Sequence, residues 1–154
     1  MYMKTVFKSL TTKKEIDLVS YVKDFLSANE HTTIFIGCDS QNRKKFTSYA
    51  IVIVLHNPGK GGHVLYSKEV YPRITNKFDR LWKEVEKSIE TAEYLRMHDI
   101  QKPSYIDLDL NPDPKYHSNQ ILRAALGYVE SMGYVPRCKP NALVASHVAD
   151  SLCK

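Results

Sequence analysis

The stretch TIFIGCDSQNRKKF, residues 33–46, joins an apolar segment to a charged loop. Residues 33–36 are apolar or β-branched and read as a buried strand, and two small residues follow them. Asp39 then comes where the strand is expected to end. A carboxylate at the tip of a central strand is costly to remove from water unless it has a partner. The partner of Asp39 is therefore the first question about this chain.

Hydrophobic spacing and turn residues predict the elements on either side of this stretch. Helices are predicted over residues 12–29, 76–97, 118–131 and 141–154. Strands are predicted over residues 33–38, 46–56, 63–71, 104–110 and 134–138. The first helix is predicted to begin at a capping box formed by Thr12 and Glu15.

The order of these elements indicates the fold class. One helix precedes three consecutive strands, which predict an antiparallel meander, and alternating helices and strands follow. This order predicts an α/β fold with a mixed five-stranded sheet, in which parallel strands follow the meander and helices cover both faces. The sequence has no linker and no repeat. We therefore expect residues 1–154 to form a single domain, with residues 1–30 as an N-terminal helical extension.

The composition of the 154 residues is that of an ordinary globular protein, with 43% hydrophobic and 25% charged residues. No apolar run approaches the roughly 20 residues that span a bilayer. The N-terminal segment lacks the apolar region of a signal peptide, so a cytoplasmic protein without a membrane partner is expected. The 3 cysteines show no CxxC spacing, which argues against a disulfide framework and against a zinc site.

The charge balance is basic, with 22 Lys and Arg against 17 Asp and Glu. The net charge of +5 fits a polyanionic partner such as nucleic acid, but many basic proteins bind none. The local pattern is more informative, because basic residues follow both acidic segments, in NRKK (42–45) and in KYHSNQILR (115–123). Positive charge beside carboxylates is suited to a metal-dependent enzyme that acts on phosphates.

Acidic residues fall at corresponding ends of two predicted strands. If the strand over 104–110 lies parallel to the strand over 33–38, Asp39 and Asp109 share one edge of the sheet, where ligands of open α/β sheets bind. Asp107 and Asp109 point to the same face because strand side chains alternate. An aspartate after a strand is more often a turn former or a helix cap. Converging carboxylates, however, repel one another unless their pKa values rise or a cation such as Mg²⁺ neutralises them.

The order of elements and the acidic positions resemble those of a ribonuclease H-like domain. The segments that carry the resemblance are IGCDSQ, RLWKEVEKS, IDLDLNP and ASHVADSLCK. More narrowly, the chain resembles the bacterial YkuK family of ribonuclease H-like proteins from about residue 15 to the C-terminus. This narrower resemblance rests on IGCDSQ, DLNPDPKYHSN and KPNALVASHVADSLCK.

The resemblance implies a set of acidic site residues. The positions that match the family pattern are, in chain order, Asp39, Glu84, Asp109 and Asp150. Glu86 stays open as an alternative to Glu84, because both flank the apolar stripe of the helix over 76–97. Asp107 stays open as an alternative to Asp109, since the family pattern more often has His at that position.

The resemblance also implies cofactors, a reaction and a partner. Asp39 would bridge two Mg²⁺ or Mn²⁺ ions, with Glu84 and Asp109 completing the shell of one ion and Asp150 helping to hold the other. A metal-activated water would hydrolyse a phosphodiester bond of RNA, DNA or a hybrid. Basic residues on loops are often only solvated surface. Those expected here to contact phosphates are Arg43, Lys44, Lys45 and Lys115.

Two other readings of the sequence remain. The first is a nucleic-acid-binding or scaffold protein on an inactive nuclease fold, which would keep the carboxylates without useful metal affinity. The second takes IDLDLN as the DxD motif of a phosphoaspartate phosphatase or a nucleotide-sugar transferase. Such a phosphatase places DxD on its first strand. The late position of the motif here argues against this second reading.

Overall fold

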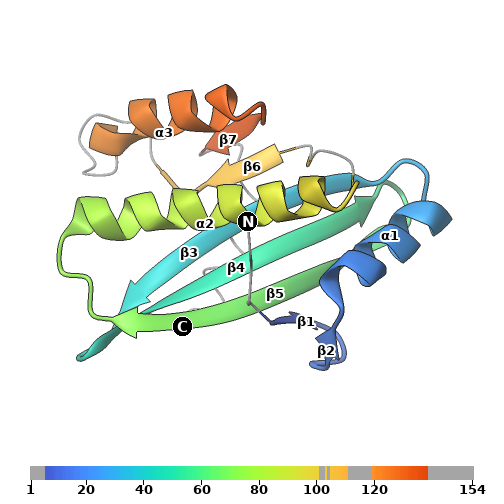
Figure 1. Cartoon of the computed structure of the whole chain (residues 1–154), viewed down its shortest axis with the longest axis horizontal. Coiled ribbons are helices and arrows are strands. Elements are labelled where there is room, and N and C mark those ends of the chain that lie inside the picture. The colour runs from blue at the N-terminus through green and yellow to red at the C-terminus, as the bar shows by residue number, and fades with distance from the viewer. Residues whose placement is uncertain (1–5, 101–102, 104, 111–118, 139–154) are drawn as a thin grey trace.

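The computed structural model describes residues 6–100, 103, 105–110 and 119–138. They form an α/β fold on one mixed seven-stranded sheet with strand order β2-β1-β5-β4-β3-β6-β7 (Figure 1). The strands are β1 (Phe7–Ser9), β2 (Glu15–Ile16), β3 (Thr33–Asn42), β4 (Phe46–Asn57), β5 (Gly61–Pro72), β6 (Tyr105–Leu108) and β7 (Pro136–Cys138). The helices are α1 (Leu18–Ala28), α2 (Lys77–Met97) and α3 (Asn119–Ser131).

Strands β3 to β7 correspond to the five predicted strands, and their pairing agrees with the prediction. β3, β4 and β5 form the antiparallel meander. β6 lies parallel to β3, with Phe35 opposite Tyr105 and Gly37 opposite Asp107, and β7 lies parallel to β6. The residues that follow β6 therefore lie toward the same end of the sheet as the second half of β3.

The prediction of five strands is wrong because the N-terminal residues also join the sheet. β1 pairs with the edge of β5, and β2 pairs with β1. The predicted capping box does not start the first helix, since Glu15 lies in β2. Instead, the side chain of Asp17 caps α1 and accepts a hydrogen bond from the N–H of Ser20 at 3.0 Å. The helix thus begins at Leu18, and the residues before it pair as two short strands.

The three described helices pack on one face of the sheet. One core cluster joins buried residues of all three helices, such as Val22, Ile89 and Ala125, to strand residues. Figure 1 shows α2 and α3 side by side over one part of the sheet and α1 over another. The second face carries a smaller buried cluster around Phe35 and Val52, in which no described helix takes part. Helices on both faces are therefore not found among the described residues, and the predicted helix over 141–154 lies outside them.

The described helices include none that is long and apolar enough to cross a membrane.

β3 is longer than predicted, and this changes the position of Asp39. The strand continues to Asn42 because β4 offers partners along its whole length, up to Thr47 opposite Asn42. Asp39 lies opposite Ala50 inside the ladder, and its residue is only 9% exposed. The expectation that Asp39 ends the strand is wrong. The carboxylate stands on a buried part of β3, where its charge acts on its neighbours with little screening.

Candidate functional site

The packing of α2 against β3 shows which of the two candidate acids on α2, Glu84 or Glu86, faces the sheet. Asn76 caps the helix by accepting a hydrogen bond from the N–H of Asp79 at 3.0 Å. From this start, Glu84 falls on the buried face with Val85, and its residue is 5% exposed. Glu86 is exposed. Of the two candidate acids on this helix, Glu84 is therefore the one that faces the sheet.

Two residues that the sequence analysis did not select hold Glu84. The hydroxyl of Ser40 donates a hydrogen bond to the carboxylate of Glu84. Arg80 Nη1 in turn donates to Ser40 Oγ at 2.8 Å. The backbone carbonyl of Arg80 accepts a hydrogen bond from the hydroxyl of Tyr49 at 3.0 Å. Ser40 and Arg80 thus form a hydrogen-bonded chain that orients Glu84.

Burial and like charge raise the pKa of Glu84 well above its usual range. Removal from water is the largest cause, and the charge of Asp39 is the next. The hydrogen bond from Ser40 and the charge of Arg80 act in the opposite direction, while Asp109 raises the pKa further. Asp39 of β3 and Asp109 after β6 therefore lie within electrostatic reach of Glu84 on α2, and their charges disfavour its ionised form.

Asp107 and Asp109, the two candidate acids of the IDLDLNP segment, both lie beside Glu84. Asp107 belongs to β6 and is 1% exposed, whereas Asp109 follows the strand and is partly exposed. Together with Cys38 and Glu84 they line a cavity of about 10 Å³. A cavity of that size holds about one water-sized group and has no room for a phosphate. The geometry keeps both aspartates as candidates, and the charge of Asp109 is among the main causes of the raised pKa of Glu84.

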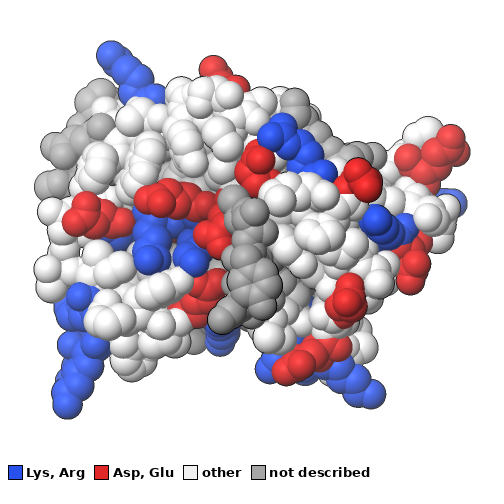
Figure 2. Space-filling view, viewed as in Figure 1, with Lys and Arg blue, Asp and Glu red and all other residues white. Residues whose placement is uncertain are grey.

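The basic loop lies beyond Asp39 along the same strand. Arg43, Lys44 and Lys45 are exposed between β3 and β4. In Figure 2, Lys and Arg side chains project from the corner of the molecule at which Figure 1 shows the β3–β4 connection. Elsewhere on that face, acidic and basic side chains are mixed over α2. Asp150 and Lys115 lie outside the described residues.

The carboxylates of this site can be compared with the ligands that a divalent cation needs. Carboxylate oxygens are the ligands that Mg²⁺ prefers, and a cation would relieve the repulsion that raises the pKa of Glu84. Among the described residues, however, no group of three or more His, Cys, Asp or Glu side chains could hold a metal ion. The residues therefore fit the cation in their chemistry, while the described part of the chain alone does not form a complete ligand cluster.

The sequence matches the ribonuclease H-like family over residues 17–154. The fold and this match show that the chain belongs to the ribonuclease H-like family. The matched region begins at the N-cap of α1, so β1 and β2 lie before it. No curated protein matches the sequence significantly.

Proposed function

We propose that the protein is a metal-dependent nuclease that hydrolyses phosphodiester bonds of nucleic acid. The observation that carries this proposal is the position of Glu84, which is buried against Ser40 of β3, where the charges of Asp39 and Asp109 help to raise its pKa. A buried carboxyl group with a raised pKa beside other carboxylates is typical of sites that receive a cation or a proton. Membership of the ribonuclease H-like family supports the cation and a nucleic-acid partner. Within that family, the motifs quoted above support assignment to the bacterial YkuK proteins.

The carboxylates are proposed to hold two Mg²⁺ or Mn²⁺ ions. Asp39, Glu84 and Asp109 would supply oxygen ligands, with Asp150 as the fourth proposed residue. Activation of a water and stabilisation of the leaving 3′ oxygen are the chemistry that bound Mg²⁺ supplies. Within the chain, Ser40 and Arg80 are positioning residues, because their hydrogen bonds fix the carboxylate of Glu84.

The nucleic acid is proposed to run from the acidic site toward the basic loop. Arg43 lies four residues beyond Asp39 in sequence, which corresponds to about 13 Å of extended chain. Arg43, Lys44 and Lys45 can therefore contact phosphates a few nucleotides from the bond that is cut. Lys115 is a further proposed phosphate contact. Such contacts position the strand without reading its sequence.

A cleavage assay with a matched control tests this proposal. The wild type, Asp39→Asn and Asp99→Asn would be incubated with Mg²⁺ or Mn²⁺ and labelled hybrid, RNA and DNA substrates. Asp99 is exposed and has a φ of 60°, a conformation that asparagine tolerates, so its substitution makes the same chemical change outside the site. We expect Asp39→Asn to lose at least about a hundredfold in rate and Asp99→Asn to be unchanged. Cleavage that is equal in the three proteins would contradict the assignment.

A second function is favoured by the hydrogen bonds around Glu84. Ser40 and Arg80 already compensate part of its charge, as they would in a nucleic-acid-binding or scaffold protein that has lost hydrolysis. This alternative predicts binding of the same substrates without metal-dependent cleavage. The assay above separates the two functions, provided that binding is measured in parallel.

A further inference from the structure

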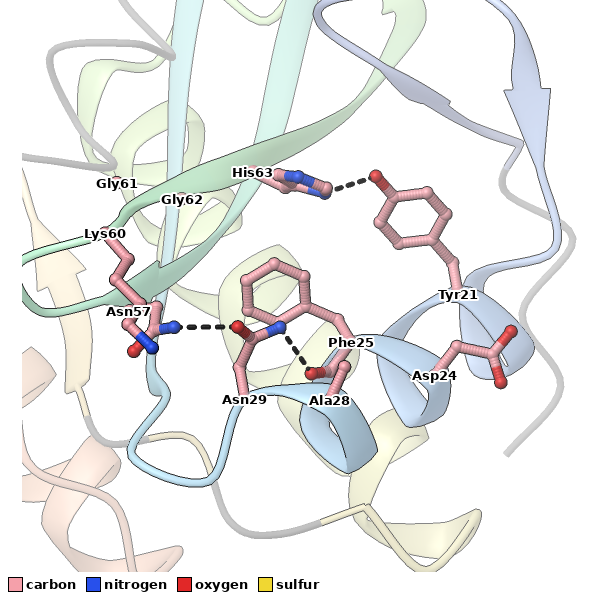
Figure 3. Close-up of a pocket in the computed structure, with 10 residues that line it drawn as sticks. All are labelled: Tyr21, Asp24, Phe25, Ala28, Asn29, Asn57, Lys60, Gly61, Gly62 and His63. Carbon is pink, nitrogen blue, oxygen red and sulfur yellow. Dashed lines mark hydrogen bonds between the residues drawn. The ribbon is translucent and has the colours of Figure 1, made fainter.

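A second cavity lies between α1 and the β4–β5 turn (Figure 3). Its volume is about 490 Å³, within the range of small-molecule sites. The cavity lies near the start of β3, because Thr33 pairs with His56, the neighbour of the cavity residue Asn57. Asp39 is six residues further along β3, or about 20 Å away. None of the described acidic site residues lines this cavity, whose own lining carboxylate is Asp24.

One wall of the cavity is aromatic and is held in place by its own contacts. Tyr21 and Phe25 come from α1, and His63 comes from β5. The Tyr21 hydroxyl and His63 Nδ1 are hydrogen-bonded at 2.5 Å, and the rings of Phe25 and His63 lie 4.8 Å apart (Figure 3). The Phe25 and His63 rings are tilted by 57°, so a planar ligand ring can pack on the face of one of them, and the wall is formed before a ligand arrives.

Two carboxamides lie beside the aromatic wall. Asn57 Nδ2 donates to Asn29 Oδ1 at 2.7 Å, and Asn29 Nδ2 donates to the carbonyl of Phe25 at 2.9 Å. Asn57 is 9% exposed, so its side chain is held rigidly. A carboxamide has two N–H donors and an oxygen with two acceptor positions. The two hydrogen bonds above therefore leave further donor and acceptor positions on these side chains. Adjacent donors and acceptors on a carboxamide match the polar edge of a nucleobase.

The opposite rim is a glycine-rich turn that carries a cation. Lys60 is exposed, and its N–H donates to the carbonyl of Asn57 at 2.9 Å. Gly61 has a φ of +81°, and a Cβ on Gly62 would approach the carbonyl oxygen of Leu55 to 2.4 Å. The turn therefore requires glycine and runs close against β4. The Lys60 side chain extends along this rim toward Asn57 (Figure 3), and an exposed ammonium group there is suited to a phosphate.

We propose that this cavity binds one nucleotide, with its base against the aromatic wall and the two carboxamides and its phosphate at Lys60. The nucleotide is either free or one unit of a single-stranded chain, since both present the same base and phosphate. The inference goes beyond the proposed function. It does not depend on hydrolysis at Asp39, because none of the described residues of the proposed nuclease site lines the cavity.

Calorimetric titration of the full chain tests this proposal. The probes are adenosine 5′-monophosphate, inorganic phosphate and a tetra-adenylate RNA, in the absence of divalent metal. The variants are Lys60→Gln and Phe25→Leu. The matched control is Lys23→Gln, which makes the same charge change at an exposed position of α1 that does not line the cavity. Amide NMR signals of Gly61 and Gly62 report in the wild type whether the ligand is bound at this turn.

We expect one saturable site for adenosine monophosphate, with shifts at Gly61 and Gly62. Lys60→Gln should weaken binding about tenfold and Phe25→Leu about fivefold or more, while Lys23→Gln leaves it unchanged. Tighter binding of the tetranucleotide would identify a strand as the source, and tighter binding of the mononucleotide would identify a free nucleotide. Inorganic phosphate that binds as tightly as the nucleotide, equal effects of Lys60→Gln and Lys23→Gln, or no saturable binding would overturn the proposal.

Discussion

Replacing Ser40 by alanine should destabilise the protein through Glu84. Ser40 is 8% exposed and donates a hydrogen bond to a buried carboxylate, and it accepts one from Arg80. A hydrogen bond to a charged group contributes about 1.5–3 kcal/mol. Arg80 is partly exposed and can turn to water, so the bond to Glu84 accounts for most of the loss. For a chain of 154 residues, that corresponds to a fall in Tm of about 3–12 °C.

Ser48→Ala provides the matched control for this prediction. Ser48 lies on the neighbouring strand, and its hydroxyl donates only a long bond of 3.4 Å to the carbonyl of Gln41. Its substitution should change the free energy of unfolding by no more than about 0.5 kcal/mol. Thermal and urea unfolding of both variants at pH 7 in EDTA would measure the difference. Equal stabilities of Ser40→Ala and Ser48→Ala would refute the role given to the Ser40–Glu84 bond.

Two further predictions concern the charges of the site. In EDTA, folding raises the pKa of wild-type Glu84 above its unfolded value of about 4.5. The protonated side chain therefore contributes fully to stability below about pH 4.5, and this contribution is lost as the pH rises through the folded pKa. Glu84→Gln should therefore be more stable than the wild type at pH 7, and the difference in the free energy of unfolding should disappear toward pH 4.5. Urea unfolding between these pH values measures it, and a difference that stays constant would contradict the raised pKa of Glu84. Substitution of Arg43, Lys44 and Lys45 by glutamine should weaken nucleic-acid binding and reduce the slope of log K against log salt by up to about 2 for a single strand. A slope that is the same in fluorescence anisotropy titrations of both proteins would remove this loop from the interface.

The central part of the fold could be predicted from the sequence because its signals are local. The β-branched run over 46–56 and the turn after it predict β4 and β5, and the apolar stripe of α2 is long enough to be unambiguous. The N-terminal strands were missed because Thr12 and Glu15 imitate a capping box. Nothing local shows that the three residues of β1 find a partner on the edge of β5, about 57 positions later.

The candidate site was predicted only in part, for a similar reason. Asp39 and Asp109 were selected because strand ends of parallel neighbours meet, which the register of β3 and β6 supports. Glu84 and Glu86 could not be separated, since helical periodicity gives both a border position and only packing buries one. The contact of Ser40 with Glu84 joins residues 44 positions apart. The spacing of Arg80 and Glu84 on α2 was the one signal that could have indicated this network.

The cavity between α1 and the β4–β5 turn, proposed to bind a nucleotide, could not be inferred from the sequence either. Its walls come from α1 and from the β4–β5 turn, and the bond between Tyr21 and His63 joins positions 42 residues apart. The segment NPGKGG alone predicts only a turn. Its place beside Asn29 and Phe25 of the α1 region depends on the tertiary structure.

The most direct test of the proposed site is whether Asp39 binds a divalent cation. Calorimetry and thermal unfolding would be measured with Mg²⁺ and with Mn²⁺ for the wild type, Asp39→Asn and Asp99→Asn. At a free metal concentration a hundred times Kd, the wild type and Asp99→Asn should gain about 2.7 kcal/mol, or about 5–11 °C in Tm. Asp39→Asn should gain almost nothing. Metal binding that is absent from the wild type, or unchanged in Asp39→Asn, would contradict a catalytic metal site at these carboxylates.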